Sequence, residues 1–89
     1  MIGRMVFYSG RVQGVGFRAT AAAIAKRYPV DGWVKNLEDG RVQLLVEGRE
    51  AAVNGFLSAI RMHWKGDIEK ADAKEIEPTG KQPGFAIMP

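Results

Sequence analysis

GRVQGVGFR, residues 10–18, separates a short apolar run (residues 5–8) from an alanine-rich segment with helical spacing. The order is typical of a strand, a glycine-rich loop and the start of a helix. Three glycines within seven residues allow positive φ angles and a close approach of the backbone to a ligand. A helix N-terminus leaves its first amide N–H groups unpaired, so such a loop can form a cradle for an anion.

The basic residue Arg18 falls in the first turn of that predicted helix. A cation there opposes the helix dipole, which is unfavourable unless an anion neutralises it. Exposed amides beside an arginine therefore indicate a phosphate-type ligand. An ordinary tight loop with a surface arginine would explain the same residues equally well.

Hydrophobic spacing and turn signals predict the order of elements along the chain. We expect strands at residues 4–10, 32–37, 41–47, 68–77 and 85–88, and helices at residues 17–27 and 50–63. This order, βαββαβ with a short final strand, is the split βαβ pattern of an α+β fold. Right-handed crossovers would place both helices on one face of a mostly antiparallel sheet.

The predicted core comes from one face of each helix and one side of the third strand. Its members are Phe17, Ala21, Ile24, Ala25 and Tyr28, then Val42, Leu44 and Val46, then Ala52, Val53, Phe56, Leu57, Ile60 and Trp64. Pro29 should end the first helix, because the residue before a proline is pushed out of the helical region. The strand at residues 68–77 carries many charges, which suits a solvated edge of the sheet.

Length and composition indicate one small globular domain over residues 1–89. The chain has no apolar run near the length of a membrane span, and its first residues lack a signal-peptide core, so we expect a cytoplasmic protein. The absence of cysteine excludes thiolate nucleophiles and sulfur-based zinc sites. Thirteen basic and ten acidic residues leave a net charge of +3. That mild excess suits an anionic substrate better than nucleic acid.

Other chemistries fit the sequence poorly. Residues 14–19, GVGFRA, match a dinucleotide-binding fingerprint, but a hairpin follows and 89 residues cannot form the two-half fold that binds dinucleotides. His63, the only histidine, falls near a helix end, where a surface histidine is common. Glu38 and Asp39 are most simply turn residues. Asn36 is unusual within a strand. It could be an early turn residue or an amide that holds a water molecule, and spacing alone does not choose between the two.

GRVQGVGFR (residues 10–18) and GWVKN (residues 32–36), followed by Leu37, Asp39 and Gly40, resemble the acylphosphatase family. The resemblance is strong over residues 6–48 and looser toward the C-terminus. It implies a ferredoxin-like α/β sandwich. It also implies hydrolysis of the carboxyl–phosphate bond of acyl phosphates to a carboxylate and inorganic phosphate, with neither metal nor cofactor.

The resemblance places the phosphate-binding arginine of the family at Arg18 and its water-orienting asparagine at Asn36. It places the phosphate-cradling loop at Gln13, Gly14, Val15, Gly16 and Phe17. We expect Arg18 to bind two phosphoryl oxygens, the loop amides to bind the remaining oxygens, and Asn36 to hold the attacking water in line. The expected partners are a small acyl phosphate and inorganic phosphate as product or inhibitor, with no nucleic acid, no membrane and a monomeric state.

The chain departs from the usual family pattern at residues 25–29 and 63–67, which affects the expected shape of the substrate mouth. Two alternatives stay open. One is a non-catalytic anion-binding or regulatory module of the same fold. The other is an RNA-binding module, which needs exposed aromatic residues on the central strands. The strand at residues 41–47 offers only Gln43, Leu45 and Glu47 on its outer face, which argues against RNA.

Overall fold

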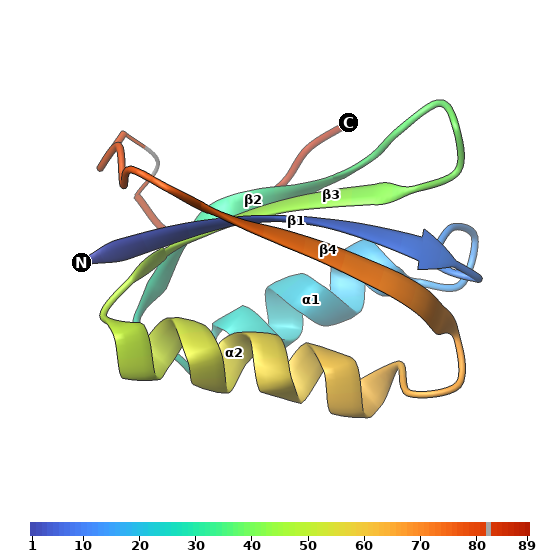
Figure 1. The fold of residues 1–89 in the computed structure, drawn as a ribbon, viewed down its shortest axis with the longest axis horizontal. Helices are drawn as coiled ribbons and strands as arrows, with labels where there is room; N and C mark the ends of the chain where they lie inside the picture. The colour runs from blue at the N-terminus through green and yellow to red at the C-terminus, as the bar shows by residue number, and fades with distance from the viewer. Residues whose placement is uncertain (82) are drawn as a thin grey trace.

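One five-stranded sheet carries both helices on the same face (Figure 1). The structure is a computed structural model that describes residues 1–81 and 83–89. In chain order its elements are β1 (Ile2–Gly10), α1 (Phe17–Ala25), β2 (Val30–Asn36), β3 (Val42–Gly48), α2 (Glu50–His63), β4 (Ile68–Ile76) and β5 (Phe85–Ile87). The strand order is β4-β1-β3-β2-β5. The predicted α+β arrangement is therefore confirmed.

All strand pairs in the sheet are antiparallel except one. β3 pairs with β1 on one side and with β2 on the other, and β4 pairs with the free edge of β1. The exception is β5, which runs parallel to β2 with Val34 opposite Ile87. Since β4 lies at the edge and is exposed over most of its length, the edge predicted from its charges is confirmed.

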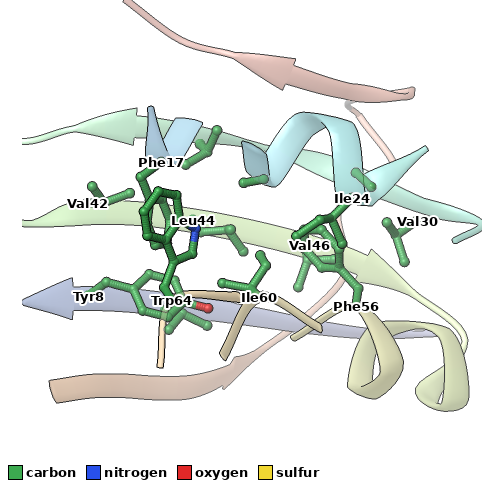
Figure 2. Packing of buried hydrophobic residues seen from close by; sticks show 14 of the residues in the cluster. Tyr8, Phe17, Ile24, Val30, Val42, Leu44, Val46, Phe56, Ile60 and Trp64 are labelled. Atoms are coloured by element: carbon green, nitrogen blue, oxygen red, sulfur yellow. The ribbon is translucent and has the colours of Figure 1, made fainter. Parts of the chain in front are cut away.

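The core fills the space between the sheet and the two helices (Figure 2). The predicted inward residues of β3, Val42, Leu44 and Val46, are fully buried. At one end of the core the ring of Phe17 stacks on Trp64, with centroids 5.2 Å apart, and lies 5.1 Å from the ring of Tyr8. Burial of one such side chain stabilises the fold by about 1.5–3 kcal/mol. This packing fixes Phe17, the first residue of α1, and with it the point where the glycine-rich loop ends.

Several element bounds differ from the sequence prediction. β1 and β2 each begin two residues earlier than predicted, because their first residues continue the pairing with β3. β2 ends at Asn36, and Leu37 directly precedes the hairpin turn. Helix α1 ends at Ala25, two residues early. The amides of Arg27 and Tyr28 bond to carbonyls three residues back, which tightens the chain into turns before Pro29.

Two residues of the predicted outer face of β3, Leu45 and Glu47, are buried, at 7% and 2% exposure. Glu47 is buried because residues 79 and 80, after β4, fold over it. The carboxylate accepts hydrogen bonds from the amides of Thr79 and Gly80, at 2.9 and 3.0 Å, and from the Thr79 hydroxyl. Burial alone would raise the pKa of Glu47, but these hydrogen bonds outweigh it and hold the pKa below its usual value. Glu47 therefore holds residues 79 and 80 against β3.

Candidate active site

The glycine-rich loop enters α1 through two residues in the left-handed region. Gly14 has φ 75° and Gly16 has φ 83°, a region that side-chain-bearing residues rarely adopt. Gly16 is also the N-cap of α1, and the helix has neither a side-chain cap nor an acidic residue in its first turn. The N-terminal amides of α1 therefore meet no negative side chain from the helix itself, as an anion site requires.

Gln13 ties this loop to the hairpin between β2 and β3. Its Nε2 donates hydrogen bonds to the carbonyl oxygens of Leu37 and Arg41, at 2.8 and 2.9 Å. These two residues flank the hairpin turn and are themselves joined by a main-chain hydrogen bond of 2.8 Å. The side chain of Gln13 thus holds the loop beside the end of β2, where Asn36 lies.

A cavity of about 300 Å³ opens between the loop, the start of α1 and the ends of β2 and β5. Its lining includes Gly14, Gly16, Phe17, Arg18, Asn36 and Ile87. The fold thus brings Arg18 and Asn36, which come from different elements, to one hollow beside the loop. Of the residues named for the phosphate cradle, Gln13 and Val15 are not part of this lining.

Among the described residues that line this cavity, Arg18 is the only charged one. Its Nη1 donates a hydrogen bond of 2.8 Å to the main-chain oxygen of Met88, directly after β5. The guanidinium is a planar fork with further N–H groups, so one bond to Met88 orients it without using all its donors. The remaining donors can bind a phosphoryl group bidentately.

Asn36 is the last residue of β2 and pairs with Val42 of β3. Its Oδ1 atom is buried, and no group in the described part of the chain hydrogen-bonds to it. A buried acceptor without a partner costs about 1–3 kcal/mol. Asn36 also lines the cavity, and a donor that reached Oδ1 would remove that penalty.

Phe17 has a double position. Its ring belongs to the core, with the whole residue 2% exposed, and the residue also lines the cavity. Both sequence-based placements of Phe17, on the buried face of the first helix and at the end of the loop, are therefore compatible with the structure.

The other polar candidates lie away from the cavity. His63 is exposed at the end of α2, with its ring 4.9 Å from that of Trp64. Asp39 accepts hydrogen bonds from the amide and the guanidinium of Arg41, which lower its pKa, and serves as a turn residue. Among residues 1–81 and 83–89, no group of three or more potential metal-ligating side chains is close enough to hold a metal ion.

A second and larger cavity, of about 470 Å³, lies between α2 and the strands β1 and β4. Its lining includes Tyr8, Leu57, Arg61 and Ala71. It shares no residue with the cavity at Arg18. Size alone would favour it as a ligand site, but the loop glycines Gly14 and Gly16, together with Arg18 and Asn36, line the smaller cavity.

Ile87 and Met88 are site residues that the sequence did not reveal. Met88 is 70 positions from Arg18, and no local pattern predicts a contact over that separation. Only the parallel pairing of β5 with β2 brings them to the cavity.

Known proteins resemble this chain over nearly its whole length. A model of the acylphosphatase family matches residues 4–87. A relative from Roseiflexus sp. (strain RS-1), named acylphosphatase, is 44% identical over an 89-residue alignment that covers 93% of this chain and 90% of the relative. The crystal structure of acylphosphatase from Bacillus subtilis has a TM-score of 0.88 and 32% identity and covers 99% of both chains.

The same fold also occurs as a small part of a longer protein. The crystal structure of T. kodakarensis HypF matches all of this chain with a TM-score of 0.82 and 32% identity. The match spans only 12% of the HypF chain. In the described residues, no helix is both long and apolar enough to cross a membrane.

Proposed function

The chain belongs to the acylphosphatase family, a family of hydrolases that act on small acyl phosphates, and we propose that the cavity at the start of α1 is its active site. The reaction splits the carboxyl–phosphate bond and yields a carboxylate and inorganic phosphate. The observation that carries the proposal is the convergence of Arg18, Asn36 and the loop glycines on one cavity.

Phosphate binding is assigned to Arg18 and to the main-chain amides of residues 13–18. The guanidinium would bind two phosphoryl oxygens, and the amides at the start of α1 would bind the others. Since phosphoryl transfer depends mainly on positioning and charge stabilisation, these donors can lower the barrier without a protein nucleophile. The hydrogen bond from Arg18 to Met88 supports this role because it holds the side chain at the cavity.

The attacking water is assigned to Asn36. Its buried Oδ1 lacks a protein partner in the described part of the chain and would accept a hydrogen bond from water. Attack in line with the acyl oxygen forms the new bond to phosphorus as the carboxylate leaves. A carboxylate is a good leaving group, so the reaction does not depend on a strong general acid.

The test is turnover of benzoyl phosphate by the purified protein in the presence of EDTA. We expect hydrolysis well above the spontaneous rate, and inhibition by inorganic phosphate. A folded protein without activity under these conditions would contradict a metal-independent active site.

A non-catalytic anion-binding module is the second candidate. The observation that favours it is the match to a small segment of HypF, because it places this fold within a much longer chain. A protein that binds inorganic phosphate but turns over no acyl phosphate would support this candidate instead.

Two further expectations are part of the proposal, namely a monomer and a cytoplasmic location. Light scattering coupled to size-exclusion chromatography measures the first, and fractionation of cells that express the protein measures the second.

A further inference from the structure

Exposed apolar residues lie in the lining of the Arg18 cavity and next to its lining residues. Among the described residues the large hydrophobic side chains with high exposure are Met1, Val15, Met62, Ile87 and Met88. One of them lines the cavity, and two others are next to lining residues in the chain or hydrogen-bonded to one. Ile87 lines the cavity, Val15 lies between the lining residues Gly14 and Gly16, and Met88 accepts the hydrogen bond from Arg18. Clusters of exposed apolar surface commonly mark a binding site.

The main chain holds Ile87 firmly in this position. β5 pairs in parallel with β2, with Ile87 opposite Val34, and the Met88 amide donates a 2.8 Å hydrogen bond to the Val34 carbonyl. On the other side, Arg18 donates to the Met88 carbonyl. The side chain of Ile87 is nevertheless 48% exposed, so it borders the cavity and faces solvent at once.

The substrate's own geometry brings its acyl group to the same place. If Arg18 and the loop amides bind the phosphoryl group, the acyl group is one bridging oxygen away and therefore lies at this cavity, which shares no residue with the larger cavity at α2 and β4. Among the described lining residues Arg18 is the only charged one, and phosphate would occupy it. These residues then leave no second cation to pair with a charge on the acyl group.

We propose that Ile87 and Val15, with Met88 beside them, form an apolar subsite that selects acyl phosphates with an uncharged, apolar acyl group. This inference rests on the proposed function and extends it to the class of substrate. An apolar wall favours an apolar group by excluding water from both surfaces, and it disfavours a distal carboxylate, which would lose hydration without gaining a partner.

The experiment compares kcat/KM for benzoyl phosphate, acetyl phosphate and succinyl phosphate, which carries a distal carboxylate. The kcat/KM of each variant is divided by the wild-type value for the same substrate, so that differences in the intrinsic reactivity of the substrates cancel. Ile87→Ser should lower kcat/KM for benzoyl phosphate by about 10-fold, the scale of a lost apolar contact, and should affect acetyl phosphate much less. In Ile87→Ser the ratio of kcat/KM for benzoyl phosphate to kcat/KM for succinyl phosphate should also be smaller than in wild type.

Three variants control this result. Met62→Ser removes an apolar side chain that is 68% exposed on α2, outside the lining of the cavity, and should leave the benzoyl-to-acetyl ratio unchanged. Ile87→Leu should restore the preference. Val15→Ser, in the loop, should shift the ratio in the same direction as Ile87→Ser without altering β5.

The outcomes separate this inference from the function on which it rests. If Ile87→Ser and Val15→Ser lower kcat/KM by the same factor for all three substrates while circular dichroism shows a folded protein, the proposal of an apolar subsite is wrong and the hydrolase assignment stands. If folded wild type hydrolyses none of the three substrates, the proposed active site itself is overturned.

Discussion

The guanidinium of Arg18 donates a 2.8 Å hydrogen bond to the main-chain oxygen of Met88, which links the start of α1 to the segment after β5. The two residues are 70 positions apart. Because this bond uses a neutral acceptor, it orients the guanidinium without neutralising its charge. The bond therefore prepares Arg18 for an anionic ligand, whereas an ion pair with a carboxylate would compete with that ligand.

Replacement of Arg18 should remove most of the activity. Arg18→Ala should lower kcat by at least about 100-fold, the scale for one preorganised donor to a developing charge. Arg18→Lys should recover little, because an ammonium cannot reproduce the planar fork. Steady-state hydrolysis of benzoyl phosphate measures both. Arg27→Ala, at an exposed arginine after α1, is the matched control and should keep wild-type rates. Near wild-type turnover in Arg18→Lys would contradict a bidentate role.

Asn36 should affect turnover more than phosphate binding. Asn36→Ala removes the buried Oδ1 that we assign to the attacking water, so kcat should fall while the inhibition constant of inorganic phosphate changes little. Asn36→Asp should behave differently, because a carboxylate beside the cavity also repels the anion. Competition kinetics with phosphate separate the two effects. A collapse of phosphate affinity in Asn36→Ala would make Asn36 a phosphate ligand or a scaffold residue.

Gln13 should act through the hydrogen bonds that join the loop to the hairpin. Gln13→Ala removes two donated bonds to carbonyl oxygens and should lower the free energy of unfolding by about 1–2 kcal/mol. Gln13→Glu should be worse at neutral pH, because a carboxylate cannot donate and would face two acceptors. Urea denaturation of both variants measures which of them has the lower free energy of unfolding. Equal stability of Gln13→Glu and wild type would show that these bonds contribute nothing.

Glu47 should make stability depend on pH in the acid range. Its pKa lies below the usual glutamate value of about 4.3, so its contribution is present in full above that value and is lost as pH falls through the lower, folded-state pKa. Glu47→Gln should therefore lower the free energy of unfolding by about 1–3 kcal/mol at pH 7 and by much less near pH 2.

Denaturant titrations at several pH values measure this difference. Glu75→Gln is the control, because Glu75 is exposed and forms only a 3.6 Å ion pair with Arg4. Glu75→Gln should change the free energy of unfolding only slightly at every pH. A loss of stability in Glu47→Gln that is equally large at pH 2 would mean that the charge on Glu47 does not strengthen its hydrogen bonds with Thr79 and Gly80.

Much of the architecture follows from local pattern. Two spacings in the sequence predict which side of an element is buried, and the structure buries those residues. They are the alternation of Val42, Leu44 and Val46 and the helical spacing of Phe17, Ala21 and Ile24. Helix α2 has the predicted bounds, Glu50–His63. Among the ends that were wrong, those at residues 2–3, 26–27 and 30–31 depend on pairing or turn hydrogen bonds that periodicity does not show.

By itself the sequence determined the order of elements, the glycine-rich loop, and the placement of Arg18 in the first turn of α1, because these depend on neighbours a few positions apart. The tertiary structure decided what surrounds that loop. It turned Gln13 toward the hairpin, left Oδ1 of Asn36 buried beside the cavity, and brought Ile87 and Met88 to its mouth. These contacts depend on which strands are adjacent in the sheet, and the parallel pairing of β5 with β2 joins residues too distant in the chain for any local pattern to encode.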